Sequence, residues 1–317
     1  MTWFQRLLIT TILATFALVV IGGTVRATGS GLGCPDWPTC HGSLIPKLEK
    51  HTLIEYSHRT AATVVGILFL GVTFFTFKTE RKNKLVFWLA FTAGVVLLFQ
   101  IILGGITVKQ DLPAEIVAAH LATAMTFMGI MIVTAVIAHF RAHGAGALPA
   151  ALGTPYTRLA LAAAAVAFIT LVLGSYISGT DAALACKGWP LCGGGGAAAS
   201  SSAQGLQMLH RFVAGLLGVI LAGLAYMGFD ERRGEPLLVA LPLVALAVYV
   251  AQALVGAANI WTSLAAGIVV AHLSLAALLW CLLVGVAALS FYLPGRRAAA
   301  ARDTAAGERA KVAGWAR

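Results

Sequence analysis

Charged side chains are scarce in this 317-residue sequence, because Asp, Glu, Lys and Arg together make up only 11% of it. A soluble domain usually carries about a quarter charged residues. Hydrophobic residues make up 59% of the chain, and its mean hydropathy is +0.88. This excess of apolar surface must face lipid, so the composition excludes an ordinary soluble protein and predicts an integral membrane protein.

Acidic residues are fewer than basic ones, which leaves a formal net charge of +10. Such a charge could indicate a nucleic-acid partner. However, the basic residues lie in short clusters between apolar runs, and no basic helix face or basic patch interleaved with aromatic residues is present. The charge pattern therefore excludes nucleic acid and leaves membrane lipid as the expected surroundings.

Eight apolar runs are long enough to cross about 30 Å of hydrocarbon as helices. They are Leu7–Val25, Thr60–Phe77, Leu85–Val108, Ile116–Phe140, Leu159–Ile177, Met208–Phe229, Leu237–Ile260 and Leu264–Leu293. The first run could be interpreted as a signal peptide. It contains Gly22, however, which matches Gly174 at the end of an internal run, so a retained helix is favoured. The sequence predicts an all-α protein with eight transmembrane helices.

Basic residues are distributed unequally between the two ends of the predicted helices. One end carries fifteen of them, namely Arg6, Lys78, Arg81, Lys82, Lys84, Arg141, Arg158, Arg232, Arg233, Arg296, Arg297, Arg302, Arg309, Lys311 and Arg317. The other end carries seven, namely Arg26, Lys47, Lys50, Arg59, Lys109, Lys187 and Arg211. Because positive charge favours the cytoplasmic side, we expect a multi-pass cell-membrane protein with both termini in the cytoplasm.

The chain repeats itself at a constant offset of 152 residues, without a gap. The matched pairs are Cys34 and Cys186, Trp37 and Trp189, Cys40 and Cys192, His58 and His210, Gln100 and Gln252, Gly104 and Gly256, and His120 and His272. Each unit contains four helices, so both cross the membrane in the same sense. We therefore predict two tandem four-helix bundles related by a pseudo-twofold axis along the membrane normal.

The repeat also predicts the domain boundaries. The first unit covers residues 1–145 and the second covers residues 146–294, and the join falls in the polar stretch Ala142–Pro155. The glycine-rich stretch at 193–203 is expected to be a flexible outer linker. Residues 295–317 are expected to form a flexible cytoplasmic tail.

Cysteine is limited to five residues, four of which lie in the two repeated outer loops. On the outer side of the membrane, where the surroundings are oxidising, such pairs favour the disulfides Cys34–Cys40 and Cys186–Cys192. The alternative is a metal site in each loop. Each loop offers only two thiols, and His41 in the first loop has no counterpart in the second, so the disulfides are favoured.

Four of the eight histidines belong to the repeat, namely His58, His120, His210 and His272. Each lies 19 or 20 residues before a phenylalanine at or near the cytoplasmic end of its run, Phe77, Phe140, Phe229 or Phe291, which is about 29–30 Å along a helix. Two imidazoles that face each other across a four-helix bundle can hold a haem iron from both sides. A polar belt at the helix ends and a zinc site are the weaker alternatives. The remaining histidines, His41, His51, His139 and His143, are expected to be solvated.

The two halves differ where function is expected to differ. Glu55 in the first half corresponds to Gln207 in the second. On a helix, Glu55 lies one turn before His58 on the same face, so its carboxylate could exchange protons near a group bound there. Arg59 and Arg211 could pair with haem propionates, or they could be interfacial residues that reach toward water.

The combined pattern resembles the bacterial haem A synthase family. The resemblance is carried by the eight spans in two repeats, a histidine on every second helix, a cysteine pair in each outer loop, and the segments TGSGLGCPDWPTCHG and IEYSHR. It implies oxidation of the C8 methyl group of haem O to a formyl group, through successive hydroxylations to a gem-diol that loses water.

The resemblance also implies roles for individual residues. The first half would hold the substrate haem O between His58 and His120, with catalytic contributions from Glu55, Cys34 and Cys40. The second half would hold a haem b cofactor between the metal ligands His210 and His272. A protohaem farnesyltransferase (haem O synthase) would supply the substrate, a cytochrome oxidase would accept the product, and a homo-oligomer is possible.

Two rival functions remain. A dihaem membrane cytochrome b that relays electrons from quinol would have near-equivalent sites, and the exchange of Glu55 for Gln207 speaks against equivalence. A transporter would need polar or broken helices at mid-membrane. Here the midplane is almost entirely apolar, and the repeated polar residues lie near the outer ends.

Overall fold

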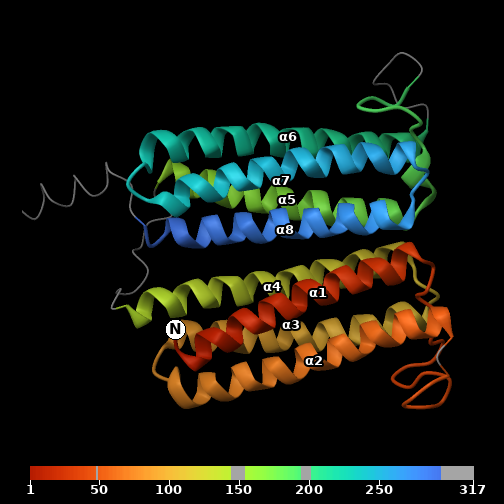
Figure 1. Cartoon of the computed structure of the whole chain (residues 1–317), viewed down its shortest axis with the longest axis horizontal. Coiled ribbons are helices and arrows are strands. Elements are labelled where there is room, and N and C mark those ends of the chain that lie inside the picture. The colour runs from red at the N-terminus through yellow and green to blue at the C-terminus, as the bar shows by residue number, and fades with distance from the viewer. Residues whose placement is uncertain (48, 144–153, 194–200, 294–317) are drawn as a thin grey trace, which may run out of the picture.

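The protein folds into long parallel and antiparallel helices (Figure 1). The computed structural model describes residues 1–47, 49–143, 154–193 and 201–293. Within these ranges eight helices are long and apolar enough to cross a membrane. They are α1 (Trp3–Ala27), α2 (Lys50–Thr79), α3 (Lys84–Lys109), α4 (Ala114–Ala142), α5 (Pro155–Ser178), α6 (Ser202–Glu231), α7 (Pro236–Trp261) and α8 (Ala266–Ser290). The predicted all-α fold with eight spans is confirmed.

Two helices begin well before the predicted start of their apolar runs. Helix α2 begins at Lys50 instead of Thr60, and α6 begins at Ser202 instead of Met208. The first turns of both helices are polar, so hydropathy marks only the lipid-facing part of each helix. The other ends lie within four residues of their predicted positions.

Polar side chains that directly precede the helices cap several helix starts. Thr2, Asn83, Thr154 and Ser201 each accept a hydrogen bond from the backbone N–H three residues later. These bonds satisfy amide groups that have no partner inside the helix. The capping residues therefore set the helix boundaries at the ends of the bundle.

Helices α1–α4 pack against one another, as do α5–α8. The two groups meet where α1 contacts α8 and where α4 contacts α5 and α8. Both cysteine loops lie at the same end of the molecule, opposite the N-terminus (Figure 1). The domain boundaries and the pseudo-twofold axis stay predictions. Most of the predicted join, most of the glycine-rich linker and the whole tail from 295 to 317 lie outside the described residues.

At the interface between the halves, an aromatic ring packs against a glycine. Trp280 of α8 packs on Gly129 of α4, where a Cβ atom would lie 2.5 Å from the indole Cη2. Trp280 is 7% exposed and belongs to a hydrophobic core that joins Met125 and Met128 of α4 to the helices of the second half. A separate core in the first half includes the edge-to-face pair Phe69 and Phe127.

We predict that Gly129→Ala lowers the stability of the purified protein by about 1–3 kcal/mol, because the added methyl group forces Trp280 out of its packed position. Thermal unfolding in detergent measures the effect. Gly285→Ala on α8 is the matched control, since a Cβ there meets nothing within 4 Å. Equal melting temperatures for the two variants would contradict the predicted packing.

Candidate functional site

Each outer loop is closed by the disulfide that the sequence predicts. The Cα atoms of Cys34 and Cys40 are 4.7 Å apart, and those of Cys186 and Cys192 are 4.4 Å apart. All four cysteines are buried. The short loops are therefore compact structures that pack against the helix ends.

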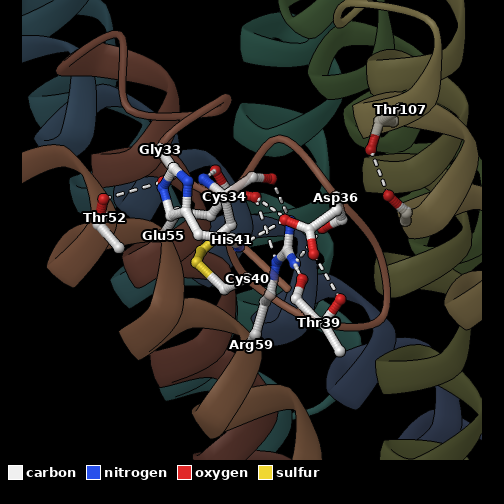
Figure 2. Close-up of polar contacts among 11 residues, drawn as sticks. Gly33, Cys34, Asp36, Thr39, Cys40, His41, Thr52, Glu55, Arg59 and Thr107 are labelled. Atoms are coloured by element: carbon white, nitrogen blue, oxygen red, sulfur yellow. Dashed lines mark hydrogen bonds and ion pairs between the residues drawn. A yellow bond between two sulfur atoms is a disulfide. The ribbon is translucent and has the colours of Figure 1, made fainter. Parts of the chain in front are cut away.

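Arg59 holds the first loop from the side of α2, as Figure 2 shows. Its Nη1 donates to the carbonyls of Asp36 and Thr39, both at 2.7 Å, and its Nη2 donates to the carbonyl of Cys34 at 2.7 Å. Its Nε and Nη2 also donate to Glu55 Oε1, at 3.2 and 2.6 Å. Every nitrogen of the guanidinium group therefore has a partner within the loop or on α2.

Arg211 holds the second loop in the same way. Its Nη1 donates to the carbonyls of Gly188, Pro190 and Leu191 at 2.8, 3.0 and 3.0 Å. Gly188 and Leu191 are the counterparts of the loop residues that Arg59 binds at Nη1. Its Nη2, however, is buried and has no hydrogen-bond partner in the described structure. This attachment of arginine to loop carbonyls was not predicted from the sequence, although the repeat of arginine and loop together was a signal for it.

Glu55 and Gln207 occupy equivalent positions but differ in charge. Glu55 is 3% exposed, and its Oε2 accepts the Cys34 N–H at 2.9 Å. Gln207 is 6% exposed, and its Oε1 accepts the Cys186 N–H at 2.7 Å. At this pair of equivalent positions the first half therefore buries a carboxyl group, which is paired with Arg59, and the second half buries an amide.

Close packing joins the first loop to the start of α2. Thr52 Oγ1 donates to the carbonyl of Gly33 at 2.9 Å, and a Cβ on Gly33 would lie only 2.3 Å from the carbonyl oxygen of His51. Glycine is required at this close approach of two backbone segments. His51 Nδ1 lies 2.9 Å from Ser30 Oγ, so this histidine has a structural contact as well as an exposed edge.

Asp36 organises the turn inside the first loop (Figure 2). Its carboxylate accepts hydrogen bonds from the Thr39 hydroxyl and from the backbone N–H groups of Gly42 and His41. These donors lower the pKa of Asp36 to about 2, with the Thr39 hydroxyl as the largest cause. The loop therefore keeps an ionised carboxylate at its surface at neutral pH.

The four repeated histidines lie on the predicted helices, α2, α4, α6 and α8. His58 lies near His120, and His210 lies near His272. The Nδ1 atoms of all four are buried without a hydrogen-bond partner in the described structure. The structure thus gathers the imidazoles into one pair in each half.

Two repeated glutamines lie beside one imidazole of each pair. Gln100 Nε2 is 3.2 Å from His120 Nε2, and Gln252 Nε2 is 3.4 Å from His272 Nε2. The repeat had indicated these glutamines without giving them a role. Among the described residues, no three His, Cys, Asp or Glu side chains gather as a metal site.

Comparison with known proteins gives a consistent set of relatives. The sequence model of the COX15-CtaA family, described as a cytochrome oxidase assembly protein, matches residues 5–284. The heme A synthase of Shouchella clausii is 30% identical over 262 residues, which cover 81% of this chain and 87% of that protein. The heme A synthase of Exiguobacterium sibiricum is 32% identical, covering 67% and 72%. That of Geobacillus kaustophilus is 27% identical, covering 85% of each chain.

We predict that the first loop loosens in acid as Asp36 is protonated. Because the folded pKa is depressed, the stabilisation is complete above the unfolded value of about 3.9 and is lost as pH falls through about 2. Hydrogen exchange of the His41 and Gly42 amides, corrected for intrinsic rates, should be constant from neutral pH to about pH 5 and should accelerate below about pH 4. Asp36→Asn should show faster exchange throughout, without this step. An identical pH profile in both proteins would contradict the assignment.

Proposed function

The chain belongs to the haem A synthase family, and on that premise we propose that its halves divide the reaction into a substrate site and a cofactor site. The protein is a multi-pass membrane enzyme with haem A synthase function, and it uses haem both as substrate and as cofactor. In the proposed reaction, the C8 methyl group of haem O is oxidised to a formyl group. The observation that carries the division is the buried Glu55 carboxylate, which has only the neutral Gln207 as its counterpart.

The first half, in this proposal, holds haem O between His58 and His120. The two imidazoles lie near each other, and each belongs to the first three turns of its helix, α2 or α4. Neutral imidazole is a common ligand of haem iron, and two such ligands fix the macrocycle between facing helices. The substrate would then lie close to Glu55, which is one helical turn from His58.

The second half is proposed to hold haem b between His210 and His272. The residues fit this group, because the pair repeats the first and places one imidazole on each of two helices of the same half. Haem b, when bound, supplies one-electron redox chemistry. The two histidines hold the iron, and the apolar helices around them exclude water.

The two arginines receive different proposed roles. Arg59 has every guanidinium nitrogen engaged, so its role is to hold the first loop and to pair with the side chain of Glu55. Arg211 keeps a buried Nη2 without a partner among the described residues. An anionic propionate is a suitable acceptor for such a donor. We therefore assign propionate binding to Arg211 and loop attachment to both arginines.

Glu55 is proposed to move protons near the substrate. Methyl oxidation requires proton transfer at a site that is sealed from bulk water, and the carboxylate is 3% exposed near the outer end of α2. The Cys34–Cys40 disulfide fixes the loop whose Cys34 N–H orients this carboxylate. Its proposed contribution to turnover is therefore to position Glu55.

The cellular setting follows from the charge distribution and the chemistry of the reaction. We propose that the protein lies in the cell membrane with both termini in the cytoplasm and both loops outside. A protohaem farnesyltransferase would supply haem O, and a cytochrome oxidase would accept haem A. Oxidised loop cysteines support the outer location, since disulfides persist outside reducing compartments.

We predict that His210→Ala abolishes most of the low-spin haem b absorbance of the purified protein, because one of the two iron ligands is removed. His58→Ala is the matched control at the equivalent position, and it should retain that absorbance while losing haem O. Reduced-minus-oxidised spectra and haem content per chain measure both variants. Unchanged haem b in His210→Ala would refute the assignment.

We predict that Glu55→Gln lowers conversion of haem O strongly, because a positioned acid or base typically contributes about 10²–10⁴-fold to a rate. The fold and the haem b of the second half should persist, since Gln207 shows that an amide can hold the loop N–H. Chromatography of haems extracted from cells that supply haem O measures the conversion.

Gln207→Glu is the matched control for this substitution and should leave haem A synthesis near normal. Wild-type haem A from Glu55→Gln would remove the carboxylate from the reaction. Equal losses in the two variants would contradict the division into a substrate half and a cofactor half.

A further inference from the structure

Four glycines of the repeat lie directly against the four histidines. A Cβ atom on Gly22 would lie 2.9 Å from His58 Cε1, and one on Gly174 would lie 3.0 Å from His210 Cε1. The corresponding distances are 3.1 Å from Gly104 to His120 and 2.9 Å from Gly256 to His272. Cβ atoms in proteins almost never lie this close to another heavy atom. Each imidazole therefore occupies the space that a side chain at the glycine position would need.

The contact has the same geometry in all four places. Each glycine lies on the helix that precedes the histidine helix, namely α1, α3, α5 or α7. Each imidazole also lies near the backbone carbonyl four residues before its glycine, which belongs to Leu18, Gln100, Thr170 or Gln252, although its Nδ1 makes no hydrogen bond in the described structure. An iron-bound imidazole needs such an acceptor for its Nδ1–H, because this contact fixes the tautomer and the orientation of the ring.

We propose that Gly22, Gly104, Gly174 and Gly256 are positioning residues for the haem ligands. The proposal rests on the proposed function, because it assumes that the four histidines bind iron. The missing side chain lets the imidazole edge lie against the neighbouring helix, within reach of its backbone carbonyl. The ring is then held against the neighbouring helix, and its plane is set by the packing of two helices.

Other glycines in these helices show that the contact is specific to the four positions. A Cβ on Gly66, Gly215, Gly267 or Gly285 would meet nothing within 4 Å. Gly66 and Gly215 lie on α2 and α6, the helices that carry His58 and His210. These open positions provide controls in which the same glycine-to-alanine change leaves the imidazole untouched.

The test measures the haem b of the full-length purified protein in Gly174→Ala and, separately, in Gly256→Ala. The added methyl group should push the imidazole away, so we expect less haem b per chain, or a shifted midpoint potential with changed g-values in electron paramagnetic resonance. Gly215→Ala should retain the wild-type values. Gly22→Ala and Gly104→Ala should also retain them, and should instead lower the amount of haem O bound.

The outcomes separate this proposal from the proposed function. Wild-type haem content, potential and g-values in both Gly174→Ala and Gly256→Ala would overturn the positioning role, if His210→Ala abolishes the haem b signal. An unchanged signal in His210→Ala would overturn the ligand assignment and the positioning role together. Equal changes in Gly215→Ala and Gly174→Ala would also overturn it, since they would reflect helix stability alone.

Discussion

The outer end of each half depends on one arginine that binds a disulfide-closed loop through its backbone carbonyls. Arg59 and Arg211 do this with equivalent acceptors, although the residues that supply these carbonyls, Asp36 and Thr39 against Gly188 and Leu191, differ between the loops. A guanidinium group suits the task because its planar donors reach several carbonyls at once. The loops cover the helix ends next to the histidine pairs. Both halves share this attachment of arginine to loop, and they differ in the residues around it.

The difference between the halves is one of charge at a shared position. A buried carboxylate is costly unless it is paired and hydrogen-bonded, and Glu55 has both Arg59 and the Cys34 N–H. Gln207 keeps the hydrogen bond to the loop and omits the charge. At this shared position a buried acidic side chain is thus present in the half that is proposed to hold the substrate and absent from the other.

Much of this arrangement could be predicted from the sequence because it repeats at a fixed offset. The helices, the two disulfides and the level of the histidines follow from apolar runs and matched residues. The early starts of α2 and α6 could not be predicted, because a hydropathy profile does not detect helical turns that consist of polar residues. The contacts of Arg59 with the first loop and of Gly22 with His58 depend on distances between segments that are apart in the sequence, and no periodicity within one segment reveals such distances.

The central claim is that the two halves hold different haems, and the most direct measurement is haem identity and stoichiometry in the double variant His58→Ala, His120→Ala. Purified from cells that supply haem O, this protein should retain one haem b per chain and contain neither haem O nor haem A. The wild-type protein should contain haem b together with haem O or haem A. Loss of haem b from the double variant, or haem b alone in the wild type, would contradict the account.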